Sequence, residues 1–248
     1  MAVEVFNRYE KKYFLDEKTY HRFLDRLQEY MEPDEYNRKH GFYTITNVYF
    51  DTRHDTLIRH SLTKPKYKEK LRLRSYGVPE QPGARVYLEL KKKLCGLVHK
   101  RRSKLGLDEA YEFVRTGVLP PLRNDMNPPV LAEIQNMLFR YALEPRAYLA
   151  YERKALFSRE SRELRITFDT NIRSRRYDLR LESGDYGEPL LDAELWLMEV
   201  KAAKAMPVWL SRLLSEHRLC STSFSKYGCE YKKYIAGRYM TKDVPVYA

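Results

Sequence analysis

The sequence predicts an α+β domain built on a mainly antiparallel sheet. Segments in which apolar and polar residues alternate, a pattern typical of half-buried strands, occur in both halves of the chain. Helical patterns follow runs of strands instead of following every strand, which is unlike the strand–helix alternation of a parallel sheet. The 248 residues, 43% of them hydrophobic, suffice for one large core. We therefore expect one domain spanning residues 1–248.

The first half is expected to begin with a strand, a helix and a second strand. Residues 3–15 alternate, and Asp16 is a suitable N-cap for a helix over 17–31. That helix has an apolar stripe formed by Tyr20, Phe23, Leu24, Leu27 and Met31. Residues 42–50 are rich in β-branched and aromatic side chains, which indicates a strand, and a short helix is expected over 51–62.

Three further strands are expected at 66–77, 86–93 and 97–105. The turn sequence PEQPGA separates the first of these from the second, and Gly96 separates the second from the third. Antiparallel pairing of 86–93 with 97–105 follows from so short a connection.

The second half is expected to begin with helices at 108–116 and 129–142, on either side of the proline-rich stretch 119–129. Because the strands after this stretch resemble those before it, we do not expect a domain boundary there. Strands are expected at 146–156, 163–172, 175–181 and 190–202. A helix over 207–217 begins with Pro207, a residue suited to a helix N-terminus, and a last helix is expected over 224–240.

The charge balance predicts a polyanionic partner. Lys and Arg total 46 against 34 Asp and Glu, a net charge of +12. The three cysteines, Cys95, Cys220 and Cys229, are odd in number and lack zinc-finger spacing, so a reducing, cytoplasmic compartment is expected. The sequence has neither a signal-peptide pattern nor an apolar run long enough to cross a membrane, so membrane association would need a partner protein.

Charged residues gather on one face of the expected strands. In residues 86–93, Glu89 and Lys91 alternate with Leu88 and Leu90, so acid and base share the face opposite the aliphatic residues. The same acid-x-lysine pattern occurs in the first and last strands, and basic pairs occupy one face of two others. These residues are Glu10 and Lys12, Glu199 and Lys201, Arg72 and Arg74, and Lys100 and Arg102.

Two readings of this pattern are open. For any one strand, a charged face in contact with water is the simpler reading. Taken together, the strands favour a sheet that curls shut, with its cations lining an interior that holds a polyanion. The guanidinium of Arg fits phosphate oxygens, and carboxylates among the bases would hold a divalent metal. Arg153 and Arg165 fit the same pattern in the second half. Nucleic-acid binding is less favoured, because it predicts bases on exposed helices or loops beside stacking aromatics.

Several short motifs occur in an order that resembles the VTC domain, the catalytic domain of vacuolar transporter chaperone polyphosphate polymerases within the triphosphate tunnel metalloenzyme, or CYTH, superfamily. The resemblance covers residues 4–236. The motifs are RYEKKYFL, VYFDT, LRLRSYG, YLELKKK, YERKAL, LRITFDT, LMEVKA and FSKYG. It implies a closed antiparallel eight-stranded β-tunnel with helices packed outside. It also implies binding of ATP or polyphosphate together with Mn²⁺ or Mg²⁺.

The resemblance also implies roles for individual residues. Transfer of a phosphoryl group would depend on Lys12, Arg72, Arg74 and Arg165. Phosphate contacts would come from these four and from Lys91, Lys100, Arg102, Arg153, Lys201 and Lys226, with the strand register leaving Lys100 and Arg102 as alternatives. Metal ligation would fall on Glu199, with Glu89 and Glu10 as further carboxylates.

One departure from the family pattern bears on the reaction. Tunnel triphosphatases begin with E-x-E-x-K, whereas this chain has Arg8, Glu10 and Lys12 at those positions. The loss of the first glutamate removes a ligand for a second metal and favours an ATP-dependent polyphosphate polymerase. A triphosphatase and a non-catalytic polyphosphate-binding module remain the alternatives.

Overall fold

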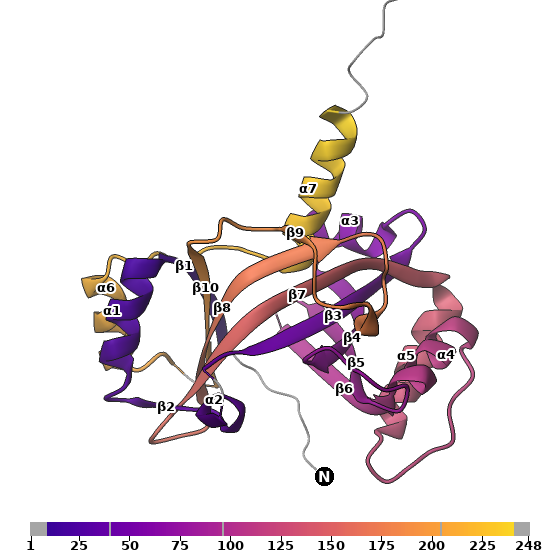
Figure 1. The fold of residues 1–248 in the computed structure, drawn as a ribbon, viewed down its shortest axis with the longest axis horizontal. Helices are drawn as coiled ribbons and strands as arrows, with labels where there is room; N and C mark the ends of the chain where they lie inside the picture. Colours follow the sequence, from indigo (N-terminus) through magenta and orange to yellow (C-terminus); the bar gives the residue numbers. More distant parts are fainter. Residues whose placement is uncertain (1–8, 40, 96, 204, 241–248) are drawn as a thin grey trace, which may run out of the picture.

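The computed structural model describes residues 9–39, 41–95, 97–203 and 205–240, which form a large antiparallel sheet with helices around it (Figure 1). The strands are β1 (Tyr9–Asp16), β2 (Met31–Pro33), β3 (Tyr43–Thr52), β4 (Tyr67–Tyr76), β5 (Arg85–Leu94), β6 (Leu97–Gly106), β7 (Leu143–Ser158), β8 (Leu164–Arg175), β9 (Glu188–Pro189) and β10 (Leu195–Ala202). The helices are α1 (Glu17–Leu27), α2 (Glu35–Lys39), α3 (Thr56–Leu62), α4 (Leu107–Thr116), α5 (Pro128–Arg140), α6 (Val208–Glu216) and α7 (Lys226–Met240), with a short 3₁₀ helix at Leu181–Ser183. The predicted α+β class is confirmed.

The main sheet follows the order β1-β10-β8-β7-β3-β4-β5-β6, while β2 pairs with β7 and β9 with β8. All of these pairs are antiparallel. The resemblance implied eight strands, whereas the described part of this sheet contains ten, eight of them along the main path. Within the described residues no backbone ladder joins β1 to β6, so hydrogen bonds do not close the sheet into the expected tunnel.

Residues of the expected type set the helix ends. The Asp16 carboxylate accepts a hydrogen bond of 2.7 Å from the Thr19 backbone N–H and so caps α1, as predicted. The Asn127 side chain caps α5 in the same way. After α4 the chain turns through Gly117, whose φ of 72° lies in the left-handed region that glycine adopts without strain.

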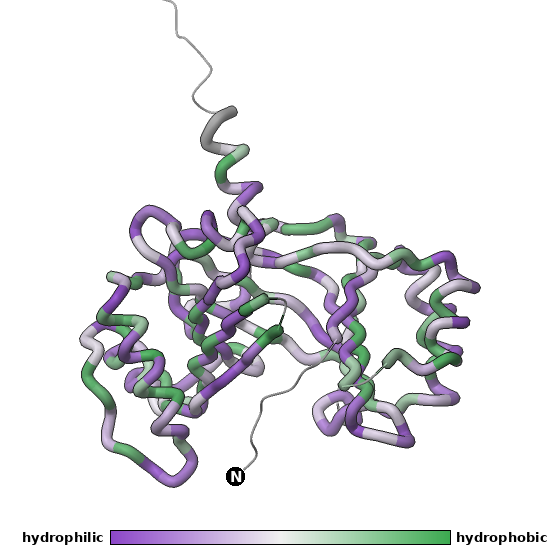
Figure 2. Tube along the Cα trace, turned by 180° about the vertical axis from the view of Figure 1, so that it is seen from behind, coloured by the Kyte–Doolittle hydropathy of each residue, from purple (hydrophilic) through white to green (hydrophobic). Residues whose placement is uncertain are grey.

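Two apolar clusters cover the outer face of the sheet. At one end α1 and α6 pack on β1, β8 and β10, where Phe23 and Leu210 meet Met198. At the other end α4 and α5 pack on β4 and β5, where Phe113 and Ile134 meet Leu88 and its neighbours. Figure 1 shows these two helix pairs at opposite ends of the sheet. In β1, β4, β5, β8 and β10 these aliphatic side chains point outward, and hydrophilic and hydrophobic residues alternate along the strands in Figure 2.

The opposite face is the inner face of a strongly curled sheet. Glu10 on β1 and Lys91 on β5 share this face, and Glu10 Oε2 lies 3.9 Å from Lys91 Nζ. These strands are six places apart in the sheet order, which would separate them by about 29 Å if the sheet were flat. The contact is therefore possible only because the sheet curls toward its charged side.

Part of the inner face is apolar. Ile45, Leu149 and Leu197 from three strands pack with Ile58 of α3 and Tyr227 of α7 in a third core cluster. Since α3 and α7 lie against this part, it forms a packed floor beside the charged residues described below.

Several predicted elements differ from those observed. The first helix ends at Leu27 and not at Met31, because Met31 begins the short strand β2. The strand predicted at 175–181 is wrong: β8 ends at Arg175, and the chain then turns through Asp178 at a left-handed φ of 45°. Arg175 is the last residue of β8 paired with β7, and its guanidinium lies 3.5 Å from the centre of the Tyr148 ring. Residues 3–8 of the first predicted strand lie outside the described residues.

Two predictions rested on the cysteines and on the length of apolar segments, and the structure describes both. Cys95, Cys220 and Cys229 are free thiols. Among the described residues, no helix combines the length and the apolar character needed to cross a membrane.

Candidate functional site

The basic residues singled out from the sequence lie together on the inner face. Strand alternation and the contacts given below place all ten of them there, with Lys70 of β4 as an eleventh cation. We call the following residues the charged inner face: Glu10, Lys12, Lys70, Arg72, Arg74, Glu89, Lys91, Lys100, Arg102, Arg153, Arg165, Asp169, Glu199, Lys201 and Lys226.

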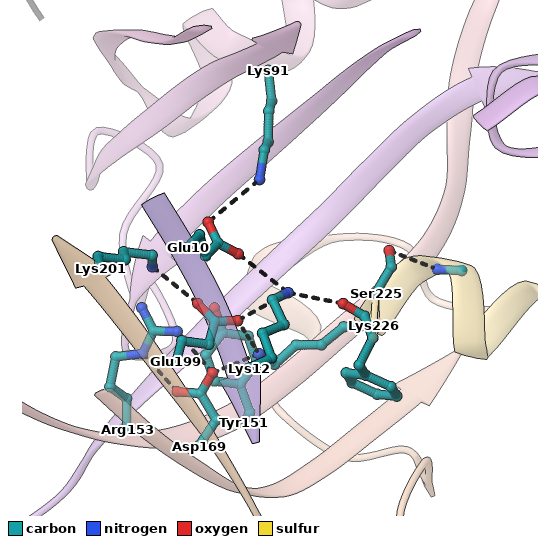
Figure 3. Close-up of polar contacts among 12 residues, drawn as sticks. Glu10, Lys12, Lys91, Tyr151, Arg153, Asp169, Glu199, Lys201, Ser225 and Lys226 are labelled. Atoms are coloured by element: carbon teal, nitrogen blue, oxygen red, sulfur yellow. Dashed lines mark hydrogen bonds and ion pairs between the residues drawn. The ribbon is translucent and has the colours of Figure 1, made fainter. Parts of the chain in front are cut away.

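Lys12 stands at the centre of one ion-pair network (Figure 3). Its Nζ lies 3.3 Å from both Glu10 Oε1 and Glu199 Oε1, and it donates a hydrogen bond of 2.9 Å to the Phe224 carbonyl. Lys201 Nζ donates to Glu199 Oε2 at 2.9 Å. Burial alone would raise the pKa of the Glu199 carboxyl, but the surrounding lysines outweigh it and hold that pKa well below its usual value. Glu199 is therefore a carboxylate at neutral pH.

Asp169 is a member of this network that the sequence analysis missed. It is fully buried, and its two oxygens accept from Arg153 Nε at 2.6 Å and from Arg153 Nη2 at 2.7 Å. Lys226, the first residue of α7, contacts Asp169 and lies 3.4 Å from Glu199 Oε1. The parity of Asp169 with Arg165 on β8 was the available signal, since both face inward from the same strand.

Glu89 organises a second network. Its Oε2 lies 2.7 Å from Arg72 Nη2 and 3.9 Å from Arg74 Nη1, and its Oε1 lies 2.6 Å from Lys100 Nζ. Only 1% of the Glu89 surface is exposed. Burial opposes the charged form, but these cations hold the pKa of the Glu89 carboxyl well below its usual value. Lys100 and Arg102 both face inward, because the Arg102 guanidinium lies 4.8 Å from the Tyr87 ring centre on the same side.

Tyr151 lies between the two networks. Its hydroxyl accepts from Arg74 Nη2 at 2.8 Å, and Lys226 Nζ lies 4.5 Å from its ring centre. Burial would raise the pKa of Tyr151, but Arg74, Arg153 and Lys226 lower it. The two halves of the charged inner face are thus continuous through this ring.

Lys70 differs from the other cations of the site. Its Nζ lies 3.4 Å from Ser225 Oγ and 5.7 Å from the ring centre of Tyr227, so its described contacts are neutral. Burial and the neighbouring cations, first among them Lys91, lower the pKa of Lys70 to about 7. A bound anion would favour the protonated form of Lys70, whose described contacts include no carboxylate.

The carboxylates suit a divalent cation only in part. Mg²⁺ and Mn²⁺ prefer oxygen ligands, and Mg²⁺ is commonly held by one or two carboxylates together with substrate phosphates. Glu10 and Glu199 converge on one point, now held by Lys12 Nζ, and fit that arrangement. Glu89 does not, because close cations contact both of its oxygens. Among the described residues, no group of three metal-ligating side chains comes together.

Comparisons with known proteins extend these observations. The VTC domain family matches residues 7–235. Among solved structures, a Bacillus halodurans protein provisionally called an adenylate cyclase is 16% identical, with a TM-score of 0.50 over 87% of this chain and 92% of that one. Protein PH1819 of Pyrococcus horikoshii OT3 is 10% identical, with a TM-score of 0.46 over 91% of this chain and 99% of that one. No curated protein matches the sequence significantly. The first of these structures shares the fold, at an identity too low to show more.

Proposed function

This chain belongs to the VTC domain family, and on that premise we propose that it is an ATP-dependent polyphosphate polymerase. The observation that carries the proposal is the composition of the charged inner face. Basic side chains from β1, β4, β5, β6, β7, β8, β10 and α7 converge there and outnumber the carboxylates. So many partly desolvated cations on one curved face repel one another unless an anion of high charge density lies among them.

In the proposed reaction, a terminal oxygen of a polyphosphate chain attacks the γ-phosphorus of ATP. The bond between that phosphorus and the β–γ bridging oxygen breaks, ADP leaves, and the chain is longer by one phosphate. Such a transfer depends on positioning and on charge neutralisation more than on covalent catalysis. Lys12, Arg72, Arg74 and Arg165 would stabilise the transferred group.

The remaining cations would hold the phosphates of donor and acceptor. These residues are Lys91, Lys100, Arg102, Arg153, Lys201 and Lys226. Glu199 and Glu10 would hold Mn²⁺ or Mg²⁺, which would supply further positive charge beside the phosphates. Movement of Lys12 toward a bound phosphate would free those two carboxylates.

We further propose that the curled sheet encloses this ligand as a tunnel. The ion pair between Glu10 and Lys91 supports this, because it links strands from opposite sides of the sheet. Because ATP is the proposed donor, we propose that the protein acts in the cytoplasm. Transport of the polymer across a membrane would need a partner protein.

Product analysis tests the proposal. The chain is incubated with ATP and Mn²⁺, and the products are separated by gel electrophoresis and anion-exchange chromatography. Polyphosphate is the expected result, with one ADP released for each phosphate added to the chain. Free phosphate without polymer would identify a hydrolase, and tight binding of tripolyphosphate without turnover would identify a binding module; either result overturns the polymerase.

A further inference from the structure

Four tyrosines lie together where the charged inner face approaches α2. They are Tyr36 of α2, Tyr43 of β3, Tyr76 of β4 and Tyr87 of β5, and we call them the tyrosine platform. The rings of Tyr36 and Tyr76 are nearly parallel, at 5° and a centroid distance of 5.5 Å. Tyr43 lies 5.5 Å from Tyr36, and Tyr87 meets Tyr76 edge-on at 5.7 Å. The proposed function does not use this cluster.

The tyrosine platform is continuous with the cations. Tyr76 stands two residues from Arg74 on β4, so both side chains face inward. The Arg102 guanidinium lies 4.8 Å from the ring centre of Tyr87. On the other side, the Tyr43 hydroxyl donates to Asp34 Oδ2 at 3.2 Å, and Arg165 Nη2 lies 3.6 Å from the same oxygen.

Packing of the domain does not account for the whole cluster. Tyr36 is 53% exposed although it stacks on Tyr76, so one side of its ring remains open to a ligand. Tyr43 and Tyr76 pack against the apolar cluster that contains Ile58 and Tyr227, whereas Tyr36 does not belong to it. Figure 1 shows α2, the helix that carries Tyr36, at the bottom of the view and α7 at the top.

We propose that the tyrosine platform stacks the base of a nucleoside triphosphate whose phosphates lie on the charged inner face. Aromatic rings bind nucleobases by stacking, with little preference among the bases. Tyr76 and Arg74 are about 7 Å apart along the strand, a gap that a ribose can bridge. The inference rests on the proposed function and adds to it, because it separates nucleotide recognition from recognition of phosphate alone.

The test compares ATP with inorganic tripolyphosphate, which has the phosphates but no base. Isothermal titration calorimetry on the full chain measures both affinities for the wild type, Tyr36→Ala and Tyr36→Trp. Tyr36→Ala should weaken ATP binding about tenfold, the loss expected for one stacked base. It should leave tripolyphosphate affinity within about twofold, and Tyr36→Trp should retain ATP binding. GTP should behave like ATP, since stacking is tolerant of the base.

Tyr177→Ala is the matched control, because Tyr177 is an exposed tyrosine whose ring partner is Tyr186 and not the platform. If Tyr36→Ala weakens the binding of ATP and of tripolyphosphate equally, or leaves ATP affinity unchanged, the inference is overturned. Neither result would contradict binding of polyanions to the charged inner face. Tripolyphosphate binding without ATP binding by the wild type would also overturn it. Failure of the wild type to bind either ligand would instead remove the proposed function, and the inference with it.

Discussion

Asp169 illustrates how one buried carboxylate positions two cations of the site. It accepts hydrogen bonds from Nε and Nη2 of Arg153 and contacts Lys226, and it is fully buried. Burial would raise the pKa of Asp169, but Arg153 and Lys226 outweigh this and lower it, so the group is ionised at neutral pH. Removing its charge would leave Arg153 without its bidentate partner and Lys226 with Glu199 alone.

We therefore expect Asp169→Asn to lower the free energy of unfolding by about 3–5 kcal/mol, the usual cost of breaking a buried ion pair on one side. Urea denaturation followed by circular dichroism measures the change. Added tripolyphosphate should restore part of the loss, because phosphate oxygens can replace the carboxylate. Asp125→Asn, at an exposed carboxylate 3.7 Å from Arg123, is the control and should cost less than about 1 kcal/mol. A loss for Asp169→Asn no larger than for this control would contradict the expectation.

Glu199 is the residue on which metal dependence is proposed to rest. Glu199→Gln keeps the size of the side chain but removes the negative charge, and turnover with ATP and Mn²⁺ should fall about 100-fold or more. Glu216→Gln changes an exposed carboxylate on α6 and should leave turnover unaltered. Turnover is measured as ADP release, and the thermal unfolding temperature of each variant shows whether it is folded. Retention of full metal-dependent turnover in a folded Glu199→Gln variant would falsify the metal assignment.

Lys70 should make the free energy of unfolding depend on pH. Its pKa is lowered from 10.5 to about 7 in the folded chain, so between these values the unfolded chain binds more protons. The free energy of unfolding should therefore gain a contribution that rises with pH from about 7 to 10.5. The groups that lower this pKa are Lys91, Lys68, Lys12 and Arg72, and the contacts at α7, Ser225 and Tyr227, are neutral.

The measurement compares urea denaturation of the wild type and Lys70→Met at pH 7, 8, 9 and 10. The free energy of unfolding of the wild type should rise relative to that of Lys70→Met as the pH increases. The reason is that the folded wild type has already released the Lys70 proton, which the unfolded chain must take up again. Parallel pH profiles for the two proteins would show that Lys70 titrates normally.

At the scale of elements, α7 supplies part of the site. Lys226, its first residue, enters the ion-pair network, while Arg176 donates to both oxygens of Glu230 at 2.7 and 3.0 Å one turn along the helix. The Tyr227 hydroxyl donates to Asp51 Oδ2 at 3.2 Å. These contacts hold the start of the helix against the sheet.

Arg176→Ala should therefore lower the free energy of unfolding by about 3 kcal/mol, because Glu230 is only 4% exposed and would lose its bidentate partner. It should also weaken tripolyphosphate binding, although Arg176 is not one of the charged inner-face residues. Arg180→Ala removes an exposed arginine paired with Glu182 and serves as the control. Urea denaturation gives the free energy of unfolding of both variants, and calorimetry gives their affinity for tripolyphosphate. Equal effects in the two variants would refute the role of Arg176 in holding α7 against the sheet.

The elements that alternate most regularly were predictable from the sequence. β4 and β5 match the predicted strands within a few residues, because a side-chain period of two is a local property of the chain. β2 was missed because Met31–Pro33 is a strand only through its pairing with β7, more than a hundred residues away. The error at 175–181 arose from Asp178, whose left-handed backbone no alternation pattern reveals.

At the scale of the whole molecule, parity predicted which residues share a face but not which of them meet. Nine of the ten predicted basic residues reach the inner face from strands, where alternation determines the side on which each emerges, and Lys226 reaches it from the start of α7. The placement of Glu89 among Arg72, Arg74 and Lys100, apart from Glu199, depends on the curl of the sheet and on register between strands distant in sequence.

The surplus of cations predicts that polyanions stabilise the fold. Tripolyphosphate at about 100 times its Kd should add about 2.7 kcal/mol to the free energy of unfolding. For a chain of this size, the thermal unfolding temperature should then rise by about 5–10 °C. Differential scanning calorimetry with tripolyphosphate, compared with sodium chloride at equal ionic strength, measures the effect. The same shift with chloride would show that screening alone is responsible.

Glu10 and Lys91 join the two sides of the sheet through one ion pair, and both side chains are partly exposed, at 25% and 45%. Such pairs contribute at most about 1 kcal/mol and weaken as salt is added, whereas a backbone ladder would resist parting along its whole length. The opening of the proposed tunnel would therefore be adjustable, and ionic strength rather than unfolding would govern how readily a bulky polymer enters it.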